Sequence, residues 1–596
     1  MGKFRESLEK NRKWWTLGTV CFALLMIVLD GNVVNLAVPS IMKSFDATIG
    51  QIEWVNNAYL LTFAILLITF GRLGDEVGRK KMFVLGLVSF IIGSLLCAIA
   101  PSINYLIAFR VIQGIGGAAM MPATLSLIAA NFEKKERGAA MGIWGAVSGL
   151  GIVLGPILGG YLTEKGLGVN LNNLLNVTDF WRYVFYINIP IGILAIVSTL
   201  TIVKESKDSE QKHKYDIVGI LLSSVSIFLL TFGFIEGAKF GWWKVNEQFI
   251  LFGQTIGAGD ISVIPFLFLL SVLMIIVFVL YEKTRTVDPL VDMNLFKARN
   301  FSIGSFAAAV LSFSMMGSFF LLPLFLQSIM GFTAIKTGQV LLPFAITIMI
   351  MAPIAGRLAD KFGGKYLISA GMAIMAIGGF YIGHFRLDTQ INELILPFII
   401  MGLGMGMSMS PLTNITLLET PEDEIGGASG VISTARQIGS VMGIAILAAF
   451  LQTTIVSNIR TDIGKIDGLS SSLQEKIIDQ VKNGNNYNAK DSLGTLLAST
   501  MQSDLMQKNI EIQKANDPRN LETYKGPSDT NAQILKYRDV TILKYQNIGM
   551  QLGQASKLSY VDAINKTFFF ASLIALFGAL VALLFKGGVR TKQNSL

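Results

Sequence analysis

Two charged residues stand inside long apolar runs of this sequence, where charges are rare. Asp30 lies in the run 14–39, and Arg110 lies in the run 103–130. Runs of this length cross a lipid bilayer as helices. A charge inside the bilayer costs on the order of 2.5–3.5 kcal/mol, so both residues are candidates for a functional role. Because burial disfavours a charged carboxylate, Asp30 is predicted to bind and release a proton. The alternative is a structural polar group at a break in the helix.

Helix geometry places these two residues at a similar depth. At 1.5 Å per residue, Asp30 is about 22 Å from the Trp15 end of an outward-running helix, and Arg110 is about 10 Å from the outer end of an inward-running one. In a hydrocarbon core about 30 Å thick, both fall in the outer half. We therefore expect the two side chains to interact, directly or through water. Arg110 would stabilise the charged Asp30 in one conformation and release it in the other.

A polar loop, 71–81, separates two further apolar runs. Its three glycines allow a short helix hairpin with close backbone approach, and its acidic and basic residues supply opposite charges that can lock or release neighbouring helices. Anchoring to the cytoplasmic surface explains Lys80 and Lys81 but not the glycine spacing. The residues predicted to form this cytoplasmic gate are Gly71, Gly74, Asp75, Gly78 and Arg79.

Small and polar residues in other runs form two further candidate sets. Run 138–162 carries small residues every three or four positions, which form a smooth packing seam with a proline that bends it. The members of this seam are Gly151, Gly155, Pro156, Gly159 and Gly160. Polar side chains in three other helices either line a cavity or bond across helices. These candidates are Asn35, Asn414, Arg436 and Gln437.

Composition identifies the class of protein. The 596-residue chain is 52% hydrophobic and 15% charged, with a mean hydropathy of +0.56, which is typical of a polytopic membrane protein. The net charge of +9 is spread over short loops, which argues against nucleic-acid binding. Both cysteines lie in apolar runs, so neither a disulfide nor a metal site is expected. No nucleotide-binding loop or nucleophile–base set occurs, so neither enzymatic activity nor direct use of ATP is expected.

Fourteen apolar runs of roughly 20 residues predict an all-α fold with fourteen transmembrane helices. The runs are about 14–39, 51–70, 81–100, 103–130, 138–162, 181–203, 215–236, 262–282, 301–328, 335–356, 365–385, 391–417, 427–455 and 565–586. Loops on one side hold about 26 Lys and Arg and short loops opposite hold about seven, so both termini are predicted to be cytoplasmic. Loop 356–365 is a weaker copy of loop 71–81, about 285 residues later, which predicts two related six-helix bundles around a central cavity.

This order of helices divides the chain into six predicted parts. They are a cytoplasmic N-terminus (1–13), an N-terminal six-helix bundle (14–203), two additional central helices (215–282), a C-terminal six-helix bundle (301–455 and 565–586), an extracellular segment (456–563) and a cytoplasmic tail (587–596). The segment 456–563 is polar, with apolar residues at helical spacing. We expect it to form a partly helical extracellular cap rather than a second catalytic domain.

Loop 71–81 resembles the loop signature of the major facilitator superfamily of transporters. Fourteen helices with an extra pair in the middle resemble its drug:proton antiporter branch, the QacA and EmrB type multidrug exporters. The resemblance implies proton coupling by Asp30, Arg110 and Gln113, and it implies an exporter signature in the seam of run 138–162. Exporters of dicationic compounds look as if they use an acidic residue in the tenth helix. Run 335–356 has none, which favours neutral or monovalent substrates.

These features together predict a secondary transporter in the cell membrane that exports amphipathic drugs or toxic compounds in exchange for protons. The expected partners are small amphipathic molecules, protons and membrane lipid. We expect no cofactor, because the proton gradient would supply the energy, and we expect a monomer. The alternative is an exporter or flippase of lipids or envelope precursors that uses segment 456–563 as an external docking surface.

Overall fold

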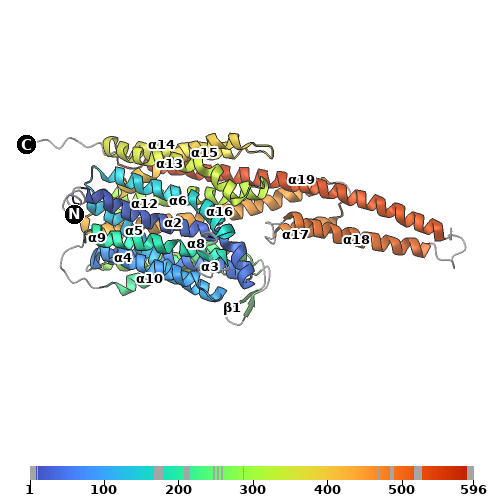
Figure 1. Cartoon of the computed structure of the whole chain (residues 1–596), viewed down its shortest axis with the longest axis horizontal. Coiled ribbons are helices and arrows are strands. Elements are labelled where there is room, and N and C mark those ends of the chain that lie inside the picture. Colours follow the sequence, from blue (N-terminus) through green and yellow to red (C-terminus); the bar gives the residue numbers. More distant parts are fainter. Residues whose placement is uncertain are drawn as a thin grey trace, which may run out of the picture.

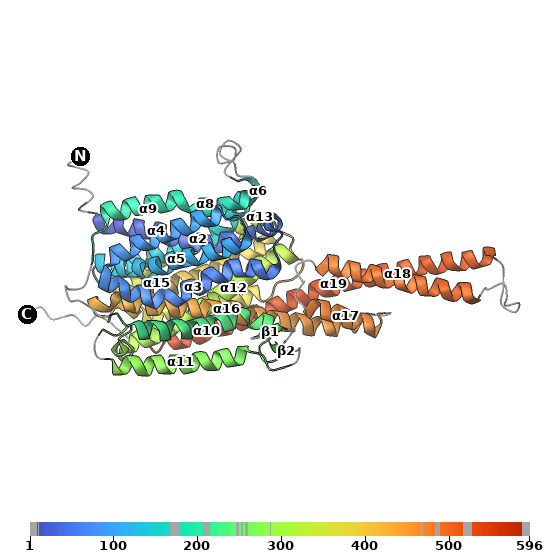
Figure 2. The same ribbon diagram turned by 90° about the horizontal axis from the view of Figure 1, so that it is seen from below.

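The computed structural model is a block of long helices from which a helical stalk projects at one end (Figures 1 and 2). The structure describes Glu9 and residues 11–166, 179–206, 215–245, 249–251, 254–256, 260–285, 288–466, 469–482, 489–515 and 527–586. The predicted tail 587–596, most of the predicted N-terminus 1–13 and parts of segment 456–563 lie outside the described residues.

The first part of the chain forms helices that match the predicted runs in order. They are α2 (Arg12–Phe45), α3 (Ile49–Val77), α4 (Arg79–Ala98), α5 (Ile103–Asn131), α6 (Arg137–Lys165), the 3-10 turn η1 (Phe180–Arg182), α8 (Tyr183–Tyr186) and α9 (Asn188–Ile202). Helix α3 starts with a capping box, in which Thr48 and Gln51 each accept a hydrogen bond from the other's backbone N–H. It ends at Gly78, whose φ of 121° only glycine adopts readily, and α4 starts there.

Two central helices follow, α10 (Ile217–Phe240) and α11 (Ile264–Thr284), which pack on each other. Between them lies a short antiparallel hairpin of β1 (Phe249–Leu251) and β2 (Gln254–Ile256), with Phe249 opposite Ile256. The next elements are η2 (Met293–Lys297), α12 (Arg299–Leu324), the π-turn η3 (Phe325–Ile329), α13 (Ala334–Phe362), α14 (Lys365–Ile382), α15 (Ile391–Leu417), η4 (Glu422–Glu424) and α16 (Ile425–Ile463).

The predicted segment 456–563 is largely helical in its described residues. It holds the end of α16, then α17 (Ser471–Lys482), α18 (Ala489–Ala515) and most of α19 (Pro527–Ala582). The predicted last span, 565–586, is therefore not a separate element but the end of a 56-residue helix. The helix starts earlier than the apolar run because its polar part pairs with α18, which supplies the burial that an isolated polar helix lacks.

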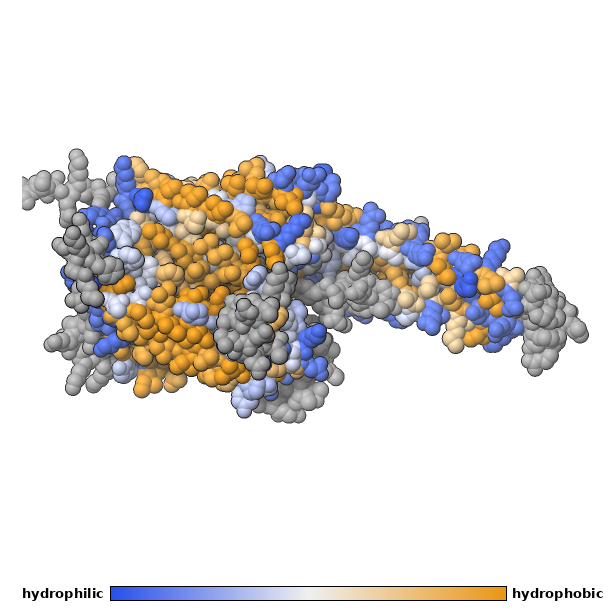
Figure 3. Space-filling model, viewed as in Figure 1, coloured by the Kyte–Doolittle hydropathy of each residue, from blue (hydrophilic) through white to orange (hydrophobic). Residues whose placement is uncertain are grey.

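Thirteen helices among the described residues are long and apolar enough to cross a membrane. Helix α6, which occupies the predicted fifth span, is not one of them; several of its side chains lie outside the described residues, and it packs between α2 and α13. The predicted total of fourteen stays a prediction. Hydrophobic side chains cover the flank of the helix block and polar ones gather at its two ends and along the stalk (Figure 3).

Contacts between early and late helices hold the block together. Helix α6 packs along α13, and α3 packs along α16. The central pair lies at the side of the block, where α10 contacts α3 and α16 (Figure 2). The start of α2 and the end of α19 lie at the end of the block opposite to the stalk (Figure 1). The division into two six-helix bundles and the side of the membrane that each end faces remain predictions.

Candidate functional site

Asp30 and Arg110 form a fully buried ion pair, as the depth argument predicts. Both side chains are at most 1% exposed, and Arg110 Nη1 lies 2.5 Å from Asp30 Oδ2. The other carboxylate oxygen, Oδ1, accepts hydrogen bonds from Gln113 Nε2 at 2.7 Å and from Asn188 Nδ2 at 3.0 Å. Ser94 Oγ accepts from the same two amides, at 2.7 and 3.1 Å. One acid from α2 is thus held by polar groups of α4, α5 and α9.

Arg110 is as fully satisfied as Asp30. Its Nη1 also donates to Gln113 Oε1 at 2.7 Å, and its Nε donates to the Val55 carbonyl oxygen at 3.0 Å. The guanidinium lies over the ring of Tyr59, 4.2 Å from the centroid, where a cation–π contact adds to the attraction. A buried charge pair is stable only when geometry and extra hydrogen bonds offset the loss of water, and this network meets that condition.

Glycines bring α4 and α5 close enough for their short polar side chains to meet. A Cβ on Gly93 of α4 would lie 2.6 Å from the backbone nitrogen of Gln113, and one on Gly116 of α5 would lie 2.3 Å from that of Phe90. Contacts this short exclude any side chain, so α4 and α5 touch backbone to backbone. Ser94, next to Gly93, therefore reaches Gln113 directly.

The predicted cytoplasmic gate is a salt bridge joined to the start of α16. Asp75 Oδ1 lies 2.8 Å from Arg79 Nη2, and the two carboxylate oxygens of Asp75 accept from the backbone N–H groups of Gly426 and Gly427, each at 2.9 Å. An acid at a helix N-terminus satisfies free N–H groups and the helix dipole together. Arg79 also donates to the carbonyl oxygen of Glu422, at 2.6 Å. These bonds tie α3 and α4 to α16.

The weaker repeat builds a matching contact at the start of α6. Asp360 Oδ1 accepts from the Gly138 backbone N–H at 3.2 Å and from Asn414 Nδ2 at 3.0 Å. A Cβ on Gly356 would lie 1.9 Å from the Gly138 carbonyl oxygen. Asn414, a candidate for cavity lining, thus bonds across helices in this structure.

The glycine seam of α6 faces α2, the helix that carries Asp30. A Cβ on Gly155 would lie 2.5 Å from Asn32 Cβ, and those on Gly151 and Gly159 would lie 2.9 and 3.0 Å from side chains of α2. Gly160 is buried in the same helix, and the side chain of Pro156 lies outside the described residues. The seam therefore sets the position of α2 against α6, which in turn packs on α13.

The other polar candidates lie apart from this network. Asn35 is exposed and accepts a hydrogen bond from Asn56 of α3 at 2.7 Å. Arg436 and Gln437 of α16 are partly buried. Arg436 donates to Thr413 of α15 and lies 5.4 Å from the ring of Trp144 of α6.

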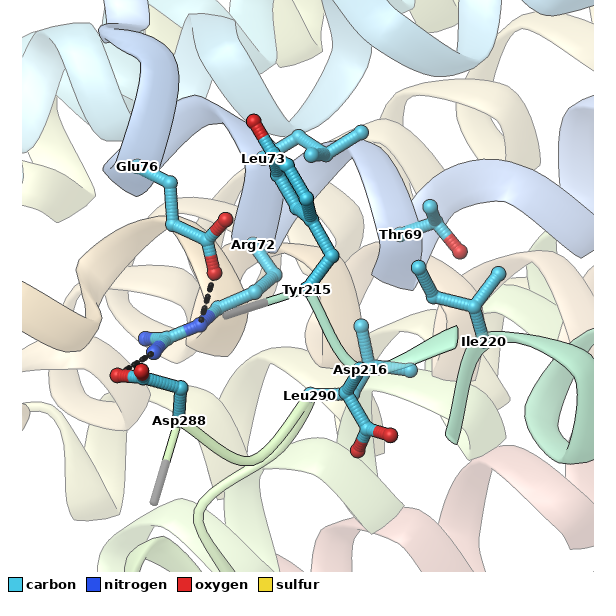
Figure 4. Close-up of a pocket in the computed structure, with 9 residues that line it drawn as sticks. All are labelled: Thr69, Arg72, Leu73, Glu76, Tyr215, Asp216, Ile220, Asp288 and Leu290. Atoms are coloured by element: carbon cyan, nitrogen blue, oxygen red, sulfur yellow. Dashed lines mark ion pairs between the residues drawn. The ribbon is translucent and has the colours of Figure 1, made fainter. Parts of the chain in front are cut away.

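A second polar cluster joins the gate to the central helices. A cavity of about 10 Å³, enough for one water molecule, is lined by Thr69, Arg72, Leu73, Glu76, Tyr215, Asp216, Ile220, Asp288 and Leu290. Figure 4 shows Arg72 between two acids: Nε lies 3.2 Å from Glu76, and Nη2 lies 4.0 Å from Asp288. Below them Asp216 caps α10, where it accepts from the Gly219 N–H at 2.9 Å.

Sequence reasoning missed four polar residues of these sites. Asn188 and Ser94 bond directly to the proton-coupling candidates, and the buried acids Asp216 and Glu282 face each other beside Gly219. A signal existed for Asn188, a lone amide in an apolar run two residues before a proline. For Asp216 and Glu282 the signal was weak, because acids at helix ends are usually solvated.

The chain is similar to known resistance and transport proteins. The chain is 29% identical over 446 residues to the tetracenomycin C resistance and export protein of Streptomyces glaucescens, covering 75% of this chain and 77% of that one. It is 31% identical over 446 residues to the multidrug resistance protein Stp of Mycobacterium tuberculosis (74% and 77% covered). It is 30% identical over 448 residues to the riboflavin transporter RibZ of Clostridioides difficile (75% and 90% covered).

Fold and family follow from two further comparisons. The solved structure of the proton:xylose symporter XylE, bound to 6-bromo-6-deoxy-D-glucose, matches with a TM-score of 0.52 at 16% identity, over 83% of this chain and 96% of that one; this likeness concerns the fold alone. The model of the Major Facilitator Superfamily matches residues 20–444. This protein is therefore a multi-pass membrane transporter that belongs to the Major Facilitator Superfamily.

Proposed function

We propose that this protein exports amphipathic drugs or toxic compounds across the cell membrane in exchange for protons. The observation that carries the proposal is the buried pair of Asp30 and Arg110. In its charged form Asp30 attracts Arg110 and accepts from two amides, whereas a proton on the carboxyl group cancels that attraction. The network therefore has two states that differ by one proton.

Protonation of Asp30 would affect other helices through the contacts of α2. Protonation leaves the Arg110 charge buried without its counter-ion, which is costly. Movement of α2 relieves that cost, and α2 contacts the glycine seam of α6, which packs on α13. The gate at Asp75 would hold the cytoplasmic side closed in one state and open in the other.

The proton gradient is a sufficient energy source for this exchange. Each proton that moves inward gains about 2.3 kcal/mol per 100 mV. A free energy of about 1.4 kcal/mol corresponds to a tenfold concentration ratio, so one proton drives more than tenfold accumulation of a neutral compound. No cofactor is then required, and a monomer is sufficient because the network lies within one chain.

The relatives favour export and leave the substrate open. The names of two of them include drug resistance, and one of these names includes export, whereas a third names a vitamin. All three cover about three quarters of this chain. We therefore assign small amphipathic molecules as the substrate class and outward transport as the direction.

Transport by purified protein in liposomes tests the proposal. A pH gradient is imposed, and the movement of a monovalent dye is followed beside that of a neutral lipophilic compound. We expect gradient-driven movement by the wild type, loss of it in Asp30→Asn, and wild-type rates in Asp388→Asn, which changes an exposed acid in a loop. Wild-type transport by Asp30→Asn would contradict proton coupling through this residue.

The stalk supports one alternative, the export of lipids or envelope precursors. Helices α18 and α19 extend well beyond the helix block, and several large apolar side chains on them are exposed, among them Met506, Leu543 and Met550. A stalk of this kind could guide a product to an external acceptor. Shortening it separates the two functions, because drug export needs only the helix block.

A further inference from the structure

Arg436 is a second arginine within the membrane-spanning block, and its surroundings differ from those of Arg110. It lies eleven residues after the start of α16 at Ile425, which is about 16 Å along the helix. In a hydrocarbon core about 30 Å thick this is near the middle of the membrane. A cation at this depth is a functional candidate, and the question is what neutralises it.

No protein acid does so among the described residues. Arg110 has Asp30 at 2.5 Å, whereas no ion pair within 4.0 Å involves Arg436 in the part of the chain that the structure describes. Its Nη2 donates to Thr413 Oγ1, and its buried Nη1 has no acceptor within the same part of the chain. The hydroxyl of Ser433, one helical turn earlier, is also buried without a described partner.

The guanidinium of Arg436 lies where early and late helices of the chain meet. Thr413 lies on α15, whereas Trp144, whose ring centroid is 5.4 Å from Arg436 Cζ, lies on α6. Trp144 is 1% exposed and donates its indole N–H to Thr124 at 3.1 Å, so its ring is held in place. Arg436 thus lies beside a fixed aromatic ring and has one guanidinium nitrogen without an acceptor among the described residues, at an interface between early and late helices.

We propose that Arg436 binds the anionic group of the transported compound. A carboxylate or phenolate would accept from Nη1 and supply the missing counter-charge, and a charge-assisted bond of this kind is strong where water is excluded. The substrate class is then an amphipathic anion. This inference rests on the proposed function, since it names the substrate of the same transport path.

Binding of two matched probes tests the inference without a gradient. Pyrenebutyrate and pyrenebutanol share an aromatic body and differ in the carboxylate. Their dissociation constants are measured on the full chain in lipid nanodiscs, by energy transfer from tryptophan to pyrene. We expect the wild type to bind the carboxylate at least tenfold more tightly than the alcohol, and Arg436→Gln to bind both equally. Arg436→Lys should keep part of the preference, because it keeps the charge but not the two-pronged donor.

A matched control and a check on folding keep the result interpretable. Lys336 is an exposed cation 4.2 Å from the ring of Phe332, and Lys336→Gln should leave the preference unchanged. Arg436→Gln removes an unpaired buried charge, so its unfolding midpoint should not fall. An equal preference for the carboxylate in Arg436→Gln and wild type would overturn the inference, whatever the liposome assay shows.

A small inorganic anion is the competing occupant, and a second measurement distinguishes it. The unfolding midpoint of each protein is compared in chloride and in gluconate. We expect no chloride-dependent difference between the wild type and Arg436→Gln. Stabilisation of the wild type alone by chloride, together with no preference for pyrenebutyrate, would assign the site to chloride and overturn the substrate role.

Discussion

At the scale of residues, the proposed proton coupling centres on one acid and the groups that hold it. Asp30 accepts from Arg110, Gln113 and Asn188. A buried charge pair is stable only when its geometry is good and its remaining oxygens accept hydrogen bonds, as they do here. Each donor can be removed separately by substitution, which measures its contribution.

Replacing Asn188 by alanine tests how much one donor contributes. The change removes one hydrogen bond to Asp30 and leaves the ion pair with Arg110 in place. Since a hydrogen bond to a charged group contributes about 1.5–3 kcal/mol, the folded protein should lose stability of that order. We expect a lower thermal unfolding midpoint in detergent and slower gradient-driven dye transport in liposomes than for the wild type. A wild-type midpoint and a wild-type rate would show that this bond contributes nothing measurable.

At the scale of elements, glycines decide which helices touch. Gly71 and Gly74 belong to the same predicted gate, yet their surroundings differ. A Cβ on Gly71 would lie 2.5 Å from the Gly426 carbonyl oxygen, whereas one on Gly74 would meet nothing within 4 Å. The prediction placed the close approach within the hairpin of α3 and α4, whereas Gly71 meets α16 and a Cβ on Gly74 would have open space around it.

Alanine substitutions at these two positions form a matched pair. Gly71→Ala should push α3 away from α16 and weaken the bonds of Asp75 to Gly426 and Gly427, at a cost of about 1–3 kcal/mol. Gly74→Ala should be neutral or stabilise by up to about 1 kcal/mol, because alanine is favoured in a helix. Thermal unfolding midpoints in detergent check both. Equal midpoints for the two variants would mean that α3 and α16 do not meet closely at Gly71.

At the scale of the whole molecule, a helix block and a stalk share two continuous helices. Helix α16 extends past the block to Ile463, and α19 returns from the stalk into it. Apolar residues of α16, α17 and α19 pack together at the base of the stalk, including Ile459, Ile477 and Leu552. Above this base α18 and α19 lie side by side, and Tyr545 donates to Asp504 at 2.5 Å.

The contact between Tyr545 and Asp504 indicates where the stalk can be shortened. Deleting residues 506–543 and joining the ends with a short Gly-Ser linker keeps this contact and the base. Because Asp30, the groups that bond to it and Arg436 all lie in the helix block, we expect dye transport within about twofold of wild type. The measurement is the liposome assay, with elution of a single symmetric peak in gel filtration as the check on folding. Loss of transport by a folded variant would favour the alternative function, in which the stalk takes part.

Local sequence determined the class of protein and the two charged candidates for its functional site. Long apolar runs have one stable form in lipid, the helix, so composition and run length predicted an all-helical membrane protein. The cost of a charge in the bilayer singled out Asp30 and Arg110, and helix rise brought them to one level before any contact was known. The family was predicted from loop 71–81 and from the order of the helices, and the match to residues 20–444 confirms it.

Tertiary structure alone decided which polar groups have partners. Asn414 and Arg436 both read as polar residues in apolar runs, yet Asn414 bonds to Asp360, whereas Arg436 bonds to Thr413 and its Nη1 has no acceptor among the described residues. Asn188 joined the hydrogen bonds around Asp30 because α9 lies beside α2 and α4. The pattern of apolar residues indicates whether a side chain faces lipid or protein. A hydrogen bond between helices depends on which helices are neighbours. The packing of the whole chain determines those neighbours.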